Sequence, residues 1–133
     1  MKLKTLTLIA LLSLLIYACS NADSLSLNGM SWELVAIGKH TPLADSHITL
    51  TFEDGQVSGN SGCNSFGGEY KLKGDSIEFG MLMSTMMACA DSARMEQEST
   101  FMKMLGDAQR VELVDGQLQI YGSGQDALTF APR

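Results

Sequence analysis

The sequence predicts a mainly β domain of the α+β class, built as a curved antiparallel sheet or a partly open small β-barrel. Short segments alternate apolar and polar side chains, which is typical of half-buried strands. Asp-Gly and Lys-Gly-Asp sequences separate several of these segments, as hairpin turns do. Only residues 88–107 have the periodicity of a long helix. We therefore expect about 7–8 strands with one helix packed across them.

Eight segments fit the strand pattern. They are residues 30–37, 47–53, 56–60, 69–72, 76–79, 111–114, 118–121 and 127–131. Trp32 in the first segment is a predicted core anchor. The second segment is the clearest, because Ile48, Leu50 and Phe52 share one face and polar residues occupy the other. Between the third and fourth segments, residues 59–68 contain four glycines, which favour tight turns and bulges.

The predicted helix at residues 88–107 has recognisable ends. Asp91 or Ser92 can cap its start, and Gly106 can end it. The apolar stripe that we expect to face the sheet consists of Met95, Phe101, Met102 and Leu105, with Met104 beside it. The polar face that we expect to meet solvent consists of Glu96, Gln97, Glu98 and Ser99.

The first nineteen residues predict an export signal with a lipid attachment site. Lys2 and Lys4 precede an apolar run that is too short to remain a membrane-spanning helix. Residues 16–19 resemble a bacterial lipobox, which implies cleavage after residue 18 and lipidation of Cys19. In the lipoproteins that this segment resembles, a serine after the cysteine, here Ser20, favours the outer membrane. The alternative is ordinary signal cleavage with an incidental cysteine.

These features divide the chain into three parts. Residues 1–18 are a predicted lipoprotein signal peptide, residues 19–28 a lipidated tether, and residues 29–132 the folded domain. The nine residues from 20 to 28 could reach about 30 Å if fully extended. We expect an outer-membrane lipoprotein of the cell envelope whose domain faces the periplasm.

The charge of the mature chain limits its partners. Removal of residues 1–18 leaves seven Lys and Arg against fifteen Asp and Glu, a formal net charge of −8. An acidic surface repels phosphate backbones, so we do not expect nucleic-acid binding. It also repels anionic headgroups, so the lipid must supply the membrane attachment.

Cys63 and Cys89 remain in the mature domain, and an exported protein meets an oxidising compartment. A disulfide between them would close a loop of about 27 residues and contribute about 3.5 kcal/mol in the chain-entropy model. The alternative is two small buried thiols that never meet. The sequence alone leaves this choice open.

Two motifs resemble the signature of the META/HslJ family. Residues 58–70 read SGNSGCNSFGGEY, and residues 84–90, just before the helix, read STMMACA. The strand that contains Trp32 also fits the opening segment of that family. The resemblance implies a partly open barrel with a helix across it, in a bacterial envelope protein linked in HslJ with heat shock and novobiocin tolerance. The matching motif residues are Gly59, Gly62, Cys63, Asn64, Phe66, Gly68, Thr85 and Cys89.

We interpret these motifs as structural. Gly59, Gly62, Gly67 and Gly68 occupy predicted bends and bulges of a curved sheet. Asn64 can bond the local backbone, and Phe66 and Tyr70 would fill the interior.

Three functional hypotheses follow. The first is a non-enzymatic outer-membrane lipoprotein that binds an envelope component during envelope stress or drug exposure. The second is a small apolar-ligand or lipid binder in a half-open barrel, with a wall of Trp32, Phe66, Tyr70, Phe79, Phe101 and Met102. The third is copper(I) or redox chemistry at the sulfur-rich run of Met83, Met86, Met87 and Cys89. Against the third, methionines can simply fill gaps between sheet and helix.

No catalytic constellation is evident, and we expect neither enzymatic activity nor a cofactor. A reactive thiolate needs a nearby cation or base, and the only histidines, His40 and His47, lie far from both cysteines in sequence. The acidic residues at helix ends and turns are predicted to be a solvated face. They are Asp91, Glu96, Glu98, Asp107 and Asp115.

Overall fold

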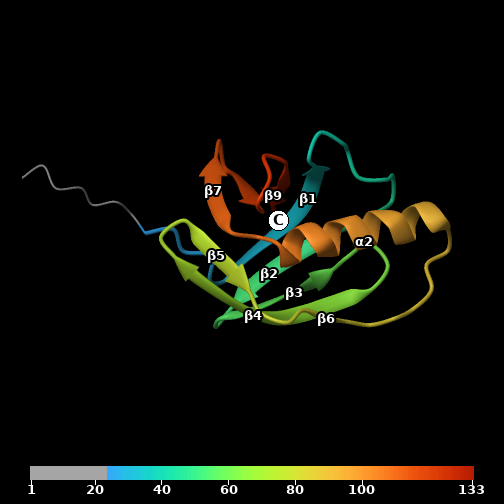
Figure 1. The fold of residues 1–133 in the computed structure, drawn as a ribbon, viewed down its shortest axis with the longest axis horizontal. Coiled ribbons are helices and arrows are strands. Elements are labelled where there is room, and N and C mark those ends of the chain that lie inside the picture. Colours follow the sequence, from blue (N-terminus) through green and yellow to red (C-terminus); the bar gives the residue numbers. More distant parts are fainter. Residues whose placement is uncertain (1–23) are drawn as a thin grey trace, which may run out of the picture.

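Residues 24–133, the part of the chain that this computed structural model describes, form one ring-like antiparallel sheet of nine strands with one helix across it (Figure 1). The predicted signal peptide and Cys19 lie outside the described residues. The elements in chain order are β1 Met30–Ile37, β2 Thr49–Glu53, β3 Gln56–Asn60, β4 Ser65–Lys73, β5 Ser76–Phe79, β6 Met83–Ser84, α2 Ser92–Gly106, β7 Arg110–Val114, β8 Gln117–Tyr121 and β9 Ala127–Pro132.

The sheet closes on itself through β4. The strand order is β3-β2-β1-β9-β8-β7-β5-β4-β6, and β4 also pairs with β3. The first half of β4 pairs with β3 on one side and with β6 on the other, while its second half pairs with β5. The junction of β5 with β7 is the shortest pairing, with the single register pair Ser76 and Arg110. The predicted mainly β fold, with a curved antiparallel sheet and one helix, is confirmed.

The differences from the predicted elements lie in the glycine-rich stretch and its partner. All eight predicted strands form, but β4 begins at Ser65, inside that stretch, and not at residue 69. The two-residue strand β6 was not predicted, because Met83 and Ser84 carry no alternation and become a strand only by pairing with Gly67 and Phe66. The helix begins at Ser92 instead of residue 88, with Asp91 as its N-cap accepting from the Arg94 backbone N at 2.8 Å.

The core fills the ring with side chains from every long strand. Ile48, Leu50 and Phe52 are fully buried, as their alternation predicts. From the helix, Phe101 packs with ring-centroid distances of 5.7 Å to Phe66 and 6.4 Å to Phe130. Burial of apolar side chains, aliphatic and aromatic, is the main stabilising contribution to a domain of this size.

The start of the helix lies outside this core. Met95, which was predicted to face the sheet, is 52% exposed, and that prediction is wrong. Figure 1 shows the first turns of α2 extending past the strands, so a side chain there has no sheet to pack against. Met102 and Met104, further along the helix, do pack against the core.

The folded domain also begins earlier than predicted. Leu27, which was assigned to the tether, is only 1% exposed and belongs to the core. Its carbonyl accepts from the Met30 N at 3.1 Å, and the Gly29 N donates to Phe52 O at 2.7 Å. The segment before β1 is therefore fixed to the sheet.

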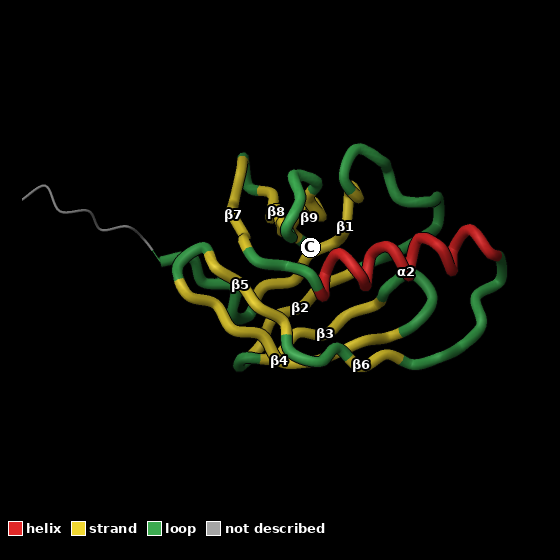
Figure 2. Tube along the Cα trace, viewed as in Figure 1, coloured by secondary structure: helices red, strands yellow, loops and turns green. Residues whose placement is uncertain are grey.

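The two ends of the molecule differ. Figure 2 shows the loop between β6 and α2 at one end, whereas the described part of the chain begins at the other. Among residues 24–133, no helix has the length and apolar character needed to cross a membrane.

Candidate functional site

A tight turn between β3 and β4 carries the first half of the site. The Ser61 N donates to Asn64 O at 2.8 Å, and the Gly62 N donates to Asn60 Oδ1 at 2.8 Å. Gly62 has φ +107°, a conformation that side chains disfavour, so the turn requires glycine there. The turn places Cys63 next to the segment that precedes α2.

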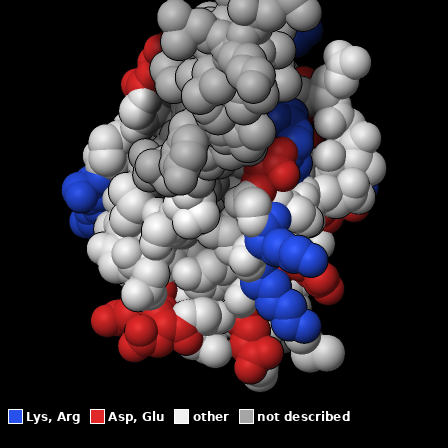
Figure 3. Space-filling model, turned by 90° about the vertical axis from the view of Figure 1, so that its left-hand side faces the viewer, with Lys and Arg blue, Asp and Glu red and all other residues white. Residues whose placement is uncertain are grey.

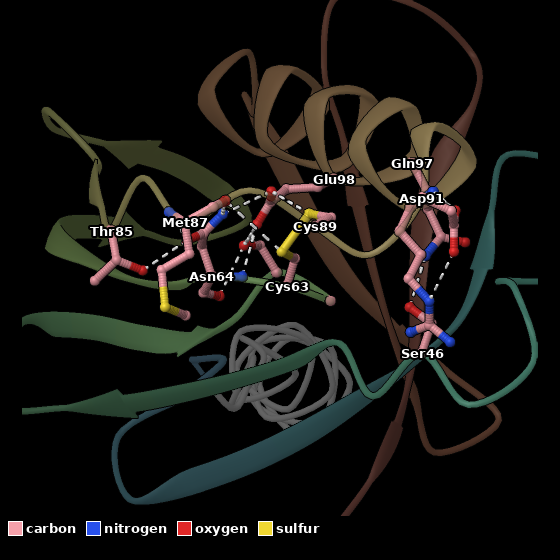
Figure 4. The surroundings of a disulfide bond; sticks show 12 residues. Ser46, Cys63, Asn64, Thr85, Met87, Cys89, Asp91, Gln97 and Glu98 are labelled. Carbon is pink, nitrogen blue, oxygen red and sulfur yellow. Dashed lines mark hydrogen bonds and ion pairs between the residues drawn. A yellow bond between two sulfur atoms is a disulfide. The ribbon is translucent and has the colours of Figure 1, made fainter.

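The structure joins Cys63 and Cys89 in a disulfide, with a Cα–Cα distance of 5.6 Å (Figure 4). Cys89 lies two residues before the N-cap of α2, so the bond ties the β3–β4 turn to the start of the helix. Both residues are partly buried. Neither sulfur is a thiolate in this form, so neither can act as a nucleophile or as a thiolate ligand.

Asn64 is the centre of a hydrogen-bond network beside the disulfide and is only 4% exposed. Its Nδ2 donates to Met87 O at 3.2 Å and to Glu98 Oε2 at 2.9 Å. Its Oδ1 accepts from Thr85 Oγ1 at 2.9 Å and from the Met87 N at 2.8 Å. All four hydrogen-bonding positions of the amide are therefore used. The side chain bonds both the N–H and the C=O of Met87. It therefore makes the hydrogen bonds that the backbone of a neighbouring strand would otherwise make.

Glu98 is the residue of this site that the sequence interpretation missed. It was predicted on the solvated face, but its Oε1 accepts from the Asn64 N at 2.9 Å and also lies within hydrogen-bonding distance of Ser61 Oγ. Its Oε2 lies 3.6 Å from Cys89 Sγ. One signal could have found it: Glu98 precedes the buried Phe101 by three residues, which places both on one helix face.

The other side chains at the start of α2 hold the loop before β2. Gln97 Nε2 donates to Ser46 Oγ at 2.6 Å, and Gln97 Oε1 accepts from the Leu43 N at 2.7 Å. Arg94 donates to the carbonyl oxygens of Ala44 and Asp45. Figure 4 shows this second group of contacts on the far side of the helix start from the disulfide.

The methionines around this network are exposed. Their exposed fractions range from 52% for Met95 to 96% for Met86, and the five are Met81, Met83, Met86, Met87 and Met95. We call these five residues the methionine surface. The interpretation of these residues as gap fillers is therefore wrong. A depression of about 430 Å³ lies within this surface, and Met86, Met87 and Met95 line it.

The predicted ligand wall is packed core. Trp32, Phe66, Phe79 and Phe101 are buried, and the ring centroids of Phe52 and Tyr70 lie 4.9 Å apart in an edge-to-face contact. Met102 packs against the same core. Side chains thus occupy the space in which the half-open barrel hypothesis placed a ligand.

The predicted copper ligands do not include a free thiolate. Cys89 is in the disulfide, and Met83, Met86 and Met87 are exposed on the surface. Within residues 24–133, one group of potential metal ligands has its atoms within 4.8 Å of one another, namely Cys63, Cys89 and Glu98. With both sulfurs bonded together, this group offers only the Glu98 carboxylate as a strong ligand.

Two motif glycines are required by close backbone approach. A Cβ on Gly59 would lie 1.9 Å from Thr49 O, and a Cβ on Gly68 would lie 2.8 Å from Met81 O. Gly67 has more room, since the nearest atom to its Cβ would be 3.4 Å away. Glycine within a strand ordinarily weakens a sheet. At Gly59 and Gly68 it is needed because a neighbouring backbone leaves no room for a Cβ.

The histidines lie apart from this network. His47 Nδ1 is 2.9 Å from Glu33 Oε1 in an exposed pair, and His40 forms a bridge with Ile37. The structure brings neither histidine to the cysteines.

The comparisons with known proteins agree with this architecture. The family model of the META domain matches residues 25–133. An NMR structure of a protein from Burkholderia xenovorans is 31% identical, with a TM-score of 0.67 over 80% of this chain and 83% of that chain. A second NMR structure is 27% identical, with a TM-score of 0.65 over 79% of this chain and 90% of that one.

A more distant structure shares the fold. The crystal structure of a DUF4847 family protein from Bacteroides vulgatus is 16% identical, with a TM-score of 0.55 over 79% of this chain and 93% of that chain. No curated protein sequence matches the chain.

Proposed function

The chain belongs to the META domain family, and on that premise we propose that it is a non-enzymatic, lipid-anchored protein of the bacterial envelope that binds another envelope protein through its methionine surface. The observation that carries this proposal is the exposure of five methionines, three of which (Met86, Met87 and Met95) line one depression together with Asn64 and Glu98. Contiguous apolar patches on soluble domains commonly mark interaction sites. Methionine is suited to such a site because its flexible, polarisable side chain adapts to different partner surfaces.

The rigidity of the site supports binding. The disulfide and the four hydrogen bonds of Asn64 hold the backbone that carries Met86 and Met87. A fixed backbone lowers the ordering cost of association, while the mobile thioether side chains retain adaptability. The partner that fits is a protein surface with aliphatic or aromatic side chains.

Three features support a non-enzymatic role. The two cysteines of the domain are bonded to each other. The Glu98 carboxylate already accepts hydrogen bonds from Asn64 and Ser61. The two histidines lie elsewhere on the surface. Nucleophilic catalysis needs a free nucleophile within hydrogen-bonding reach of a base, and this arrangement does not offer one.

The N-terminal pattern supports the proposed envelope location. Residues 1–18 have the features of an export signal, and Cys19 and Ser20 fit a lipoprotein destined for the outer membrane. Several acyl chains, at about 0.8 kcal/mol per buried methylene, would hold the domain firmly to a bilayer. The resemblance of its motifs to HslJ supports a role in envelope stress and drug tolerance.

Site-specific crosslinking in living cells tests the binding surface. A photoreactive amino acid at Met86 should give one discrete crosslinked protein, whereas the same group at exposed Lys39 should not. Replacement of Met83 and Met87 with Gln should abolish the crosslink from position 86 without changing the melting temperature. Equal crosslinking at Met86 and Lys39, or crosslinking that survives both replacements, contradicts the proposal.

Lipidation has its own test. Mass spectrometry of the mature protein should show an acylated Cys19, and the protein should fractionate with the outer membrane. A Cys19→Ser variant should lose both properties. A wild-type chain that is cleaved without acylation would contradict the lipid anchor while leaving the methionine surface intact.

A further inference from the structure

An open apolar groove lies where the chain leaves the domain toward its N-terminus. The groove has a volume of about 730 Å³, and its lining includes Ser24, Leu25, Met30, Val111 and Leu113. It borders the core, since Val111 in its lining is fully buried and Leu25 and Met30 pack against the core, and it lies away from the methionine surface. Neither the disulfide site nor the family motifs include any of these residues.

Exposed apolar side chains extend this groove onto the tip of the β7–β8 hairpin. Leu113 is 45% exposed and Val114 is 38% exposed. They are adjacent in β7, so they point to opposite faces of the strand, and both meet solvent. Figure 3 faces this end of the molecule, and the part of it that the undescribed residues leave visible shows uncharged surface with charged side chains on both sides.

The position of the chain exit is fixed by the fold. Leu27 is buried in the core, and the Asp54 N donates to Asn28 Oδ1 at 2.7 Å. Seven residues, 20–26, lie between Cys19 and the buried Leu27. Fully extended, the chain from Cys19 to Leu27 spans about 27 Å. A lipid on Cys19 would therefore keep this end of the domain close to the bilayer.

We propose that the groove and the hairpin tip formed by Leu25, Met30, Leu113 and Val114 are the surface on which the domain rests against a lipid bilayer. This inference rests on the lipid anchor of the proposed function and deepens it by giving the domain an orientation. Apolar side chains at such a surface enter the boundary between headgroups and acyl chains. Lys73 ends β4 directly before the β4–β5 turn, and the carboxylates of Asp75 and Glu112 line the groove, so both signs of charge are available to a zwitterionic headgroup.

The orientation has a functional consequence. Figure 1 shows the loop between β6 and α2 at the end of the molecule opposite the segment with which the described chain begins. With the groove against the bilayer, Met86 and Met87 on that loop would point away from the membrane, where a periplasmic partner can reach them.

Fluorescence quenching by brominated lipids tests this surface directly. The mature chain from Cys19 is coupled through the Cys19 thiol to a maleimide lipid in vesicles of phosphatidylethanolamine with a minority of phosphatidylglycerol. Because Cys63 and Cys89 are bonded to each other, the coupling is directed to Cys19. The test variant is Leu113→Trp, the matched control is Met86→Trp, and the unsubstituted chain gives the background of buried Trp32.

Acyl chains brominated near the headgroup should reduce the emission of Leu113→Trp by about twofold, since a residue at this boundary lies about 5–10 Å into the membrane. Met86→Trp should show no more quenching than the unsubstituted chain. Val114→Trp serves as a second reporter if circular dichroism shows that Leu113→Trp does not fold.

Two results would overturn the inference. One is the absence of quenching at both Leu113 and Val114, and the other is equal quenching at Met86. Chemical coupling of Cys19 separates this question from lipidation in the cell, because a chain that is never acylated in vivo can still be tested for the face that it turns to a membrane.

Discussion

Asn64 holds Glu98 by both oxygens of its carboxylate: the Asn64 N donates to Oε1 and Nδ2 donates to Oε2, each at 2.9 Å. This contact joins the turn after β3 to the helix α2. The same amide bonds Thr85 and Met87, so one side chain connects three segments that are distant in sequence. The methionine surface depends on this connection, because Met86 and Met87 belong to one of the three segments.

Replacement of Asn64 should therefore be costly. In Asn64→Asp an oxygen replaces Nδ2 and faces Met87 O and Glu98 Oε2, which both need a donor. We expect the free energy of unfolding in urea to fall by about 3 kcal/mol. The control is Asn28→Asp, since Asn28 uses its Oδ1 only as an acceptor for the Asp54 N. It should change stability by less than about 0.5 kcal/mol, and equal losses in the two variants would contradict the role of Asn64.

Removal of the disulfide should weaken the domain without unfolding it. The bond spans a sequence separation of 26 residues. In the double variant Cys63→Ala and Cys89→Ala, the chain-entropy model predicts a loss of about 3.5 kcal/mol. Denaturation of both proteins with and without a reductant measures this, and the reductant should affect only the wild type. A wild-type domain in which thiol titration detects Cys63 and Cys89 would refute the bond.

Gly59 should not tolerate a side chain. The Cβ of Gly59→Ala would lie 1.9 Å from Thr49 O, so β2 and β3 must move apart. Overpacking of this kind costs about 1–3 kcal/mol and occasionally more. Gly106→Ala is the matched control, because its Cβ would meet no atom within 4 Å. Thermal unfolding should show a lowered melting temperature for Gly59→Ala alone, and similar melting temperatures would mean that the strands yield easily.

The end of α2 should respond to pH through Asp107. Its Oδ2 accepts from the Ser123 N at 3.1 Å and from Ser123 Oγ at 2.9 Å. These hydrogen bonds, with a smaller contribution from the charge of Lys103, hold the pKa of the Asp107 carboxyl below its ordinary value of 3.8. A carboxyl whose pKa is lower in the folded state stabilises the fold above its ordinary pKa, and this contribution disappears as the pH falls through the folded-state pKa.

Asp107→Asn should thus lower the melting temperature at pH 7, and its difference from wild type should shrink once the pH falls below about 3.8. Ser123→Ala removes one of the two bonds and should act in the same direction with a smaller effect. A difference for Asp107→Asn that is constant from pH 7 to pH 3 would show that the charge of Asp107 does not contribute.

Much of the sheet could be predicted because its signals are local. The alternation of Ile48, Leu50 and Phe52 defines a strand without reference to its partner, and Asp91 caps its helix through a residue only three positions away. The site is different. Glu98 resembles any polar residue of a solvated helix face, and its inward orientation depends on Asn64, which is 34 positions away in sequence.

The sequence by itself determined the strands, their turns and the capped helix, because each of these depends on neighbouring residues and their period. Only the tertiary structure decided that Ser65 starts a strand, that Cys63 meets Cys89, and that Met86 lies in solvent. These outcomes depend on which segments, distant in sequence, supply the hydrogen-bond partners and bury the side chains. The closed ring of strands fixes the positions of all these segments together.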